Sequence, residues 1–189
     1  VEKFEQLVGS TVKAEYAIAA NSATSALHVA CMALNVDRGD KVWTSPITFV
    51  ASANCALYCD AEVDFVDIDP LTNNMDPQVL EKKLKKAEKQ NALPTVVIPV
   101  HMGGLSPNMK AIKSLADKYG FKIIEDASHA IGASYYDKPV GNCEFSDITI
   151  FSFHPVKIIT SAEGGIAVTN DKKLADKMRT LTTHGITKN

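Results

Sequence analysis

The chain has 189 residues, of which 46% are hydrophobic and 22% charged, and its formal net charge is −2. This composition predicts a soluble globular protein with one sizeable core, and the dispersed basic residues disfavour nucleic-acid binding. No apolar run approaches the roughly 20 residues that a membrane span needs, and the N-terminal VEKFEQLVGS lacks the pattern of a signal peptide. We therefore expect a cytoplasmic protein that binds neither membranes nor nucleic acids.

Strand-like and helix-like segments alternate along the chain. Apolar runs predict strands at residues 15–20, 41–45, 63–68, 95–100, 121–126, 147–153 and 165–170. Periodic patterns predict helices at residues 23–35, 48–59, 76–90, 107–119 and 171–182. This alternation indicates an α/β fold, in which helices cover both faces of a mostly parallel, mixed seven-stranded sheet as a three-layer α/β/α domain. Because residues 127–170 lack a full helix between their strand-like runs, we expect any antiparallel strand there.

The lysine-rich segment EKKLKKAEK, at residues 81–89, is the densest basic run. Leu80, Leu84 and Ala87 recur there at helical spacing, which favours an amphipathic helix with solvated lysines over a binding patch.

Four cysteines, Cys31, Cys55, Cys59 and Cys143, form no CxxC pair. Cys55 and Cys59 lie one helical turn apart and could supply half of a metal site. No histidine or second cysteine pair lies nearby at ligand spacing, so we expect buried free thiols and no metal site.

The segment NSATSA follows the first predicted strand and opens a helix. Asn21 or Ser22 can cap this helix, which leaves the backbone N–H groups of Ala23, Thr24 and Ser25 free at its positive end. These groups suit a single phosphate monoester, although an ordinary Ser/Thr cap has the same sequence. The segment has neither GxGxxG nor a P-loop, which disfavours a dinucleotide or a triphosphate.

The segment IIEDASHA places Glu125 and Asp126 at the end of a predicted strand, followed by His129. A carboxylate in such an apolar setting needs a partner. For Asp126 this partner can be a protonated ring nitrogen, or the side chain can simply cap the next turn.

The segment FSFHPVKIITSAEGG places Lys157 in a loop between two strand-like runs. An amine held between buried strands is desolvated, which lowers its pKa toward that of a nucleophilic free amine. Lys157 is therefore a candidate for Schiff-base chemistry.

Four features, each weak alone, together match the requirements of pyridoxal 5′-phosphate (PLP). The cofactor needs a Schiff-base lysine (Lys157), a partner for its pyridinium nitrogen (Asp126), a phosphate site (Ala23 and Thr24) and usually an aromatic ring stacked on its own (Phe49). We therefore predict a PLP site.

The segments NSATSAL, TSPITFVASAN, EDASHAIGA and FSFHPVKIITSAEGGIAVTND, in this order, resemble the DegT/DnrJ-type nucleotide-sugar aminotransferases among the fold-type I PLP enzymes. The pattern S-x-H-x-x-K-x-I-T-x-x-E-G-G is the most specific part, and the resemblance covers essentially the whole chain. SPITFVASAN and VDFVDID are most similar to the subgroup that aminates a 4-keto sugar in pseudaminic acid biosynthesis.

The resemblance implies roles for individual residues. Lys157 corresponds to the lysine that binds the cofactor covalently, Asp126 to the partner of the pyridine nitrogen, and His129 to a residue beside the ring oxygen. Some relatives with histidine at the lysine position are dehydratases, and Lys157 argues against that activity.

Further contacts are implied for the phosphate, the ring and the substrate. Ala23, Thr24 and Ser152 match the phosphate contacts, and Phe49 matches the stacked aromatic. His154 lies within the specific pattern, which favours a place near the cofactor or the substrate. His101 and His184 receive no role.

Family members are longer, with a short N-terminal segment and a C-terminal small domain. We therefore expect residues 1–189 to form the PLP-binding large domain alone. Fold-type I enzymes of this kind are dimers whose sites include residues of the partner, so the resemblance implies a homodimer.

The implied reaction moves an amino group from L-glutamate to a keto nucleotide-sugar. A UDP-4-keto-6-deoxy-2-acetamido sugar is the first expectation, with a dTDP-3- or 4-keto-deoxysugar as the alternative. A PLP-binding fragment without activity of its own stays open. A PLP-dependent regulator is disfavoured because no helix-turn-helix or basic surface is evident, and an NAD domain because NSATSA contains no glycine.

Overall fold

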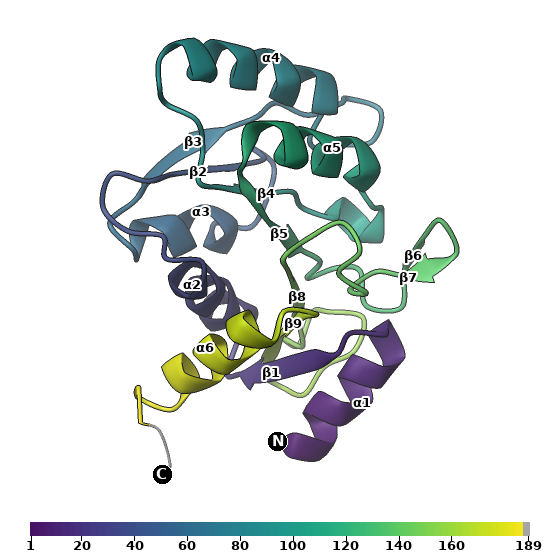
Figure 1. The fold of residues 1–189 in the computed structure, drawn as a ribbon. Helices are drawn as coiled ribbons and strands as arrows, with labels where there is room; N and C mark the ends of the chain where they lie inside the picture. Colours follow the sequence, from purple (N-terminus) through teal and green to yellow (C-terminus); the bar gives the residue numbers. More distant parts are fainter. Residues whose placement is uncertain (187–189) are drawn as a thin grey trace.

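A single mixed sheet organises the computed structural model, which describes residues 1–186 (Figure 1). Its strand order is β1-β9-β8-β5-β4-β2-β3. The strands are β1 (Tyr16–Ala20), β2 (Lys41–Thr44), β3 (Glu62–Phe65), β4 (Val96–Ile98), β5 (Lys122–Asp126), β8 (Ile148–Ser152) and β9 (Gly165–Thr169). All the predicted strands are present, which confirms the seven-stranded sheet.

Strand β9 is the antiparallel member of this sheet. It pairs antiparallel with both β1 and β8, whereas β3, β2, β4, β5 and β8 pair in parallel. The chain reaches β9 from β8 through a loop at residues 153–164 rather than through a crossover helix, and a connection without a crossover returns the chain in the opposite direction. The expected antiparallel strand therefore lies within residues 127–170.

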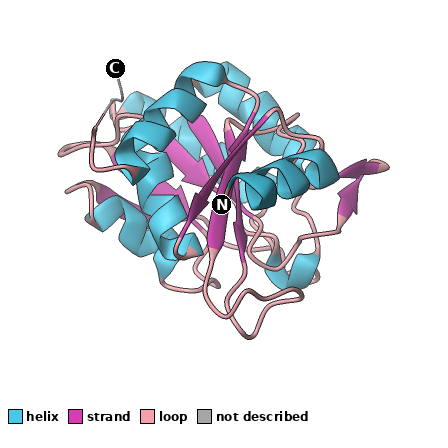
Figure 2. Cartoon of the chain, turned by 90° about the horizontal axis from the view of Figure 1, so that it is seen from below, coloured by secondary structure: helices cyan, strands magenta, loops and turns pink. Residues whose placement is uncertain are grey.

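Helices cover both faces of the sheet (Figure 2). One layer contains α2 (Ala23–Ala33), α3 (Ala51–Leu57) and α6 (Lys172–Thr182); the other contains α1 (Glu2–Val12), α4 (Pro77–Lys89) and α5 (Met109–Tyr119). In β8, Ile148 and Ile150 pack in the first layer's core, whereas Phe151 packs in the core beneath α1. Successive strand residues point to opposite faces, so the strands are apolar on both sides and the three-layer prediction is confirmed.

Local sequence sets the ends of several helices. Asp76 caps α4 by accepting a hydrogen bond from the Gln78 N–H at 2.7 Å, and Pro77 occupies the first turn. Such a cap contributes about 1 kcal/mol. The buried residues of α4 are Leu80, Leu84 and Ala87, which confirms the amphipathic interpretation of the lysine-rich segment.

Helix α1 was not predicted from the sequence. Val1 precedes it without a side-chain cap, and the charged Glu5 lies on its buried face. Glu5 Oε1 accepts a hydrogen bond from the backbone N–H of Ala19 in the edge strand β1, and Oε2 lies 3.2 Å from Nη1 of Arg179. A polar residue on the inner face weakens the apolar period that identifies a helix.

Three further segments differ from the predictions. Helix α3 begins at Ala51 rather than near residue 48, because residues 45–50 form a loop that contains Pro46. A small hairpin, β6 (Ser134–Tyr135) and β7 (Lys138–Pro139), and a short 3-10 turn, η1 (Met102–Gly104), were also not predicted.

All four cysteines are free, as expected, but only Cys31 and Cys55 are buried, whereas Cys59 and Cys143 are partly exposed. Within residues 1–186, no group of three or more His, Cys, Asp or Glu side chains is arranged to hold a metal ion. None of the helices in that range is long and apolar enough to cross a membrane.

Candidate active site

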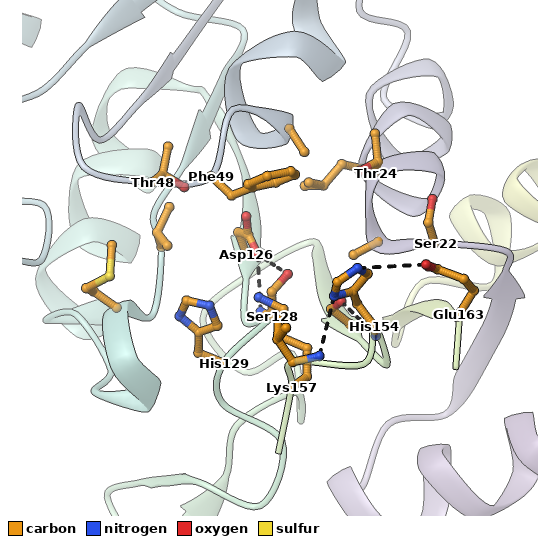
Figure 3. A pocket seen from close by; sticks show the side chains of 18 residues that line it. Ser22, Thr24, Thr48, Phe49, Asp126, Ser128, His129, His154, Lys157 and Glu163 are labelled. Atoms are coloured by element: carbon orange, nitrogen blue, oxygen red, sulfur yellow. Dashed lines mark hydrogen bonds and ion pairs between the residues drawn. The ribbon is translucent and has the colours of Figure 1, made fainter. Parts of the chain in front are cut away.

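A cavity of about 290 Å³ lies at the carboxyl ends of β5 and β8 (Figure 3). The start of α2, the loop before α3 and the loop between β8 and β9 complete its walls. All the residues predicted for the site line it: Ala23, Thr24, Phe49, Asp126, His129, Ser152, His154 and Lys157. The fold therefore gathers residues that are spread over 135 positions of the sequence, from 23 to 157.

The start of α2 forms one wall of the cavity. Ser22, not Asn21, is the cap, and its Oγ accepts a hydrogen bond from the Ser25 N–H at 3.1 Å. The prediction of a free Ser25 N–H is therefore wrong, because the cap uses this group. The N–H groups of Ala23 and Thr24 belong to the first turn, where no intrahelical acceptor exists. They remain available to an anion beside the positive end of the helix.

Gly165 holds the sheet directly against this helix start. A Cβ added at Gly165 would overlap the backbone of Ser22 and Ala23, so no larger residue fits without movement of the helix. Ser152 is the partner of Gly165 in the register of β8 and β9. The glycine thus brings the buried Ser152 hydroxyl to the same wall of the cavity as the first turn of α2.

Asp126 ends β5 and is 4% exposed. Its Oδ1 accepts hydrogen bonds from the backbone N–H of Ser128 at 3.1 Å and from the Ser128 hydroxyl at 2.6 Å. Its Oδ2 accepts a hydrogen bond from the Ser52 hydroxyl at 2.6 Å. Neighbouring hydroxyls therefore orient this carboxylate within the cavity wall. Asp126 also caps the next turn, which was the alternative role predicted for it, because its Oδ1 accepts the hydrogen bond from the Ser128 N–H.

Lys157 lies between β8 and β9, in the loop where the sequence places it. Its backbone N–H donates to the carbonyl of His154 at 2.9 Å, which closes a turn. Burial lowers the pKa of the Lys157 amine, and the charge of Asp126 opposes this shift without cancelling it. The direction is the one expected from the sequence, and it increases the neutral fraction of the amine at a given pH.

His129 lies on the same side of the cavity as Lys157 (Figure 3). Burial lowers the pKa of His129, and the positive charge of Lys157 lowers it further, against the opposing effect of Asp126. The neutral imidazole is therefore favoured near neutral pH, and it can donate one hydrogen bond and accept another.

Phe49 projects from the loop before α3 on the side of the cavity opposite Lys157 (Figure 3). Its side chain is 70% exposed, which is unusual for a phenylalanine and leaves its ring face free for a ligand.

His154 and Glu163 lie at the rim of the cavity. Nε2 of His154 is 3.8 Å from Oε1 of Glu163, and both side chains are about half exposed or more. The two side chains thus lie close together at the rim.

Several cavity residues were missed by the sequence analysis, namely Thr48, Ser52 behind the wall, Ser128 and Glu163. Thr48 and Ser52 lie within the segment TSPITFVASAN, and Glu163 within the specific pattern, but no role was derived for them. Hydroxyl residues at spacing i, i+4 were the available clue for Thr48 and Ser52.

His101 and His184, to which no role was assigned, do not line the cavity. His101 is buried, with Nε2 2.8 Å from Glu125 Oε2 but without an aligned hydrogen bond, and Nδ1 3.1 Å from the Ser106 hydroxyl. Burial raises the pKa of Glu125, and His101 together with neighbouring hydroxyls lowers it by more, so the net shift is downward. Glu125 thus belongs to a structural pair, unlike its neighbour Asp126.

Comparison with known proteins gives relatives over the whole chain. One relative is the UDP-4-amino-4,6-dideoxy-N-acetyl-beta-L-altrosamine transaminase of Campylobacter jejuni subsp. jejuni serotype O:23/36 (strain 81-176). It is 44% identical to this chain over 188 residues, which are 100% of this chain and 48% of the relative. The chain spans about half the length of the curated relatives it matches.

Solved structures agree with this result. Helicobacter pylori PseC, described as an aminotransferase involved in the biosynthesis of pseudoaminic acid, superposes with a TM-score of 0.89 at 34% identity, over 100% of this chain and 49% of PseC. NtdA from Bacillus subtilis, solved with bound cofactor PMP, has a TM-score of 0.87 at 30% identity, over 98% of this chain and 40% of NtdA.

A family model provides the most direct assignment, because it matches every residue from 1 to 189. Its aminotransferases are PLP-dependent, in agreement with the cofactor predicted from the sequence. The chain belongs to the DegT/DnrJ/EryC1/StrS aminotransferase family.

Proposed function

We propose that this chain supplies the PLP-binding large domain of an aminotransferase that moves an amino group from L-glutamate to a keto nucleotide-sugar. One observation carries the proposal: a single cavity joins an amine of lowered pKa (Lys157), an oriented buried carboxylate (Asp126) and the free N–H groups at the start of α2.

The residues of this cavity fit PLP. The first turn of α2, with the hydroxyls of Thr24 and Ser152, would hold the phosphate, because backbone N–H groups and hydroxyls together satisfy its oxygens. Asp126 would face the ring nitrogen and Phe49 the ring itself. His129, with a favoured neutral ring, would hydrogen-bond the ring oxygen without adding a charge.

When bound, PLP supplies an aldehyde that captures amines and a ring that withdraws electrons from the captured carbon. Lys157 would anchor the cofactor through its neutral amine and would also move a proton to and from the reacting carbon. Asp126 would stabilise the positive charge of a protonated ring nitrogen. The walls formed by α2 and the β8–β9 loop hold these groups in position.

A UDP-4-keto-6-deoxy-2-acetamido sugar is the preferred acceptor substrate, in pseudaminic acid or surface-glycan biosynthesis. The printed name of the Campylobacter relative and the description of PseC support this choice. A dTDP-3- or 4-keto-deoxysugar is the alternative, and assays of the chain alone test whether it is an inactive PLP-binding fragment. Glutamate as the donor and a cytoplasmic location remain predictions from the family resemblance and the sequence.

A homodimer is supported by apolar side chains around the cavity opening. Phe49 and Val156 line the cavity, and Ile158 and Ile159 follow Lys157 in the same loop; all are at least 55% exposed. Clustered exposed apolar residues beside a site are typical of an interface. His154, which lines the cavity, would lie near the cofactor or the substrate.

The proposal is tested by borohydride reduction of the protein with PLP, followed by peptide mass spectrometry. A pyridoxyl adduct is expected on Lys157 and not in Lys157→Ala. In a separate, unreduced sample, incubation with glutamate should release about one equivalent of 2-oxoglutarate per site, and turnover should require a keto nucleotide-sugar. Lack of an adduct on Lys157, or its presence on another lysine, would refute the proposal.

A further inference from the structure

Ser52 lies in the first turn of α3, fully buried behind the cavity wall. Its hydroxyl donates to Oδ2 of Asp126 at 2.6 Å, and its oxygen lies 2.8 Å from Oγ1 of Thr48. Three residues from two segments, 48–52 and the end of β5, thus form a continuous chain of hydrogen bonds.

The direction of this chain follows from counting protons. Ser52 has one hydroxyl proton, and a carboxylate can only accept, so that proton is used on Asp126. The Ser52 oxygen must therefore accept from Thr48, whose hydroxyl proton points away from the cavity and toward Ser52. The chain runs from Thr48 through Ser52 to Asp126.

The same count limits what Asp126 can still accept. A carboxylate has about four acceptor sites. The N–H and the hydroxyl of Ser128 use two on Oδ1, and Ser52 uses one on Oδ2. One site remains, on Oδ2, and it belongs to a side chain that lines the cavity.

The chain also connects Asp126 with the aromatic residue of the cavity. The backbone N–H of Ser52 donates to the carbonyl of Phe49 at 3.1 Å, so the loop that carries Phe49 is attached to the residue that holds Asp126. The position of the carboxylate and the position of the ring are therefore coupled through Ser52.

We infer that Ser52, held by Thr48, is a positioning residue that directs the one free acceptor site of Asp126 toward the ring nitrogen of the bound cofactor. Because this role concerns a nitrogen of the cofactor, it rests on the proposed function. Ser52 itself does not line the cavity, so its proposed role is exerted through Asp126.

The test compares the binding of PLP and of its 1-deaza analogue, which has carbon in place of the ring nitrogen, by the protein and its Ser52→Ala variant. Affinity is measured by spectroscopic titration. We expect PLP to bind about tenfold more weakly to the variant, as for the loss of one hydrogen bond to a charged group, and the analogue to bind with less than a twofold change. A general loss of structure would weaken both ligands equally and would overturn the inference.

Ser45→Ala is the matched control. Ser45 is also buried between β2 and α3, and its hydroxyl has no hydrogen-bond partner within residues 1–186. The control should bind both ligands like the wild-type protein. If Ser52→Ala does not fold, Thr48→Val keeps the side-chain volume in the loop, and it should lower the affinity for PLP severalfold while sparing the analogue.

The outcomes separate the two proposals. If borohydride does not trap PLP on Lys157 of the wild-type protein, the proposed function fails. If Lys157 is trapped but Ser52→Ala and Thr48→Val bind PLP as tightly as the wild-type protein, the positioning role is wrong and the proposed function stands.

Discussion

At the residue scale, the chemistry of the cavity depends on how a few polar groups are desolvated and oriented. The Lys157 amine has a pKa below its ordinary value because it is partly buried, while Asp126 receives hydrogen bonds from two serines. Neither the lowered pKa of Lys157 nor the orientation of Asp126 requires direct contact with a charged side chain. The amine and the carboxylate are therefore both available to a ligand that enters between them.

Replacement of Lys157 by alanine or arginine tests its proposed role. Alanine removes nucleophile and base together, and arginine keeps the positive charge but cannot act as a nucleophile because guanidinium stays protonated. Both variants should fold, as judged by circular dichroism, and both should lose transamination by several orders of magnitude. Near-normal turnover of Lys157→Arg would mean that Lys157 is only a structural cation.

The lowered pKa of Lys157 predicts early reaction with an amine-specific label as the pH rises. An amine reacts only when it is deprotonated, and a lowered pKa moves that transition to lower pH. Lys85 is the internal comparison, because its hydrogen bond and ion pair with Glu81 raise its pKa. Competitive acetylation followed by peptide mass spectrometry should show Lys157 modified at a lower pH than Lys85. The reverse order would contradict the assigned shift.

At the scale of elements, the site depends on the contact between β9 and the start of α2. Gly165 allows the strand to touch the backbone of Ser22 and Ala23, and its register partner Ser152 then faces the same wall. Gly165, the second glycine of the EGG segment, is thus required for close packing and not for an unusual backbone angle.

Gly165→Ala should move α2 away from β9. The added methyl group overlaps the first turn of α2, so we expect a loss of about 1–3 kcal/mol in the free energy of unfolding, as for an overpacked core. Affinity for PLP should fall at least tenfold because the N–H groups of Ala23 and Thr24 are displaced. Urea denaturation and a spectroscopic titration measure the two effects.

Gly9→Ala provides the control for Gly165→Ala. A Cβ at Gly9, within α1, meets its nearest neighbour, the Ala14 carbonyl oxygen, at an ordinary 3.4 Å. The change should leave PLP affinity unaltered and stabilise the helix slightly, since alanine favours helix more than glycine does. If both variants bound PLP equally well, the proposed contact between β9 and the phosphate site would be wrong.

At the scale of the whole molecule, the cavity opens beside exposed apolar residues as well as beside His154 and Glu163. Ile158 and Ile159 directly follow Lys157, so a second copy that covers them would lie next to the cavity. Dimer formation and completion of the site would then be the same event.

Ile158→Glu tests this proposed interface. Burial of a charge at an apolar contact is costly, so the variant should shift the protein from dimer to monomer in light scattering at micromolar concentration. Leu71→Glu is the control, because Leu71 is 91% exposed and does not line the cavity. A monomeric wild-type protein, or equal dimerisation of wild type and Ile158→Glu, would refute this interface.

Local patterns in the sequence were enough to predict the seven strands, the helices α2 to α6 and four parts of the cavity, namely Lys157, Asp126, Phe49 and the start of α2. His129, Ser152 and His154 rested on the family resemblance, and Thr48, Ser128 and Glu163 were not predicted. Strand alternation, helix periodicity and the spacing around Lys157 are properties of neighbouring residues, so they can be recognised without the fold. Helix α1 was not predicted because the charged Glu5 on its buried face interrupts the apolar period. Glu5 is bound there by Ala19, 14 positions away, and by Arg179, 174 positions away, and the local sequence shows neither contact.

Only the tertiary structure decided which residues support the site. Ser52 and Asp126 are 74 positions apart, and their hydrogen bond exists because the fold brings the first turn of α3 beside the last residue of β5. The contact of Gly165 with Ser22 likewise requires β9 to lie antiparallel between β1 and β8. Such contacts arise from the packing of whole elements, which brings together segments that are distant in the sequence. No local sequence pattern identifies which distant segment each of them will contact.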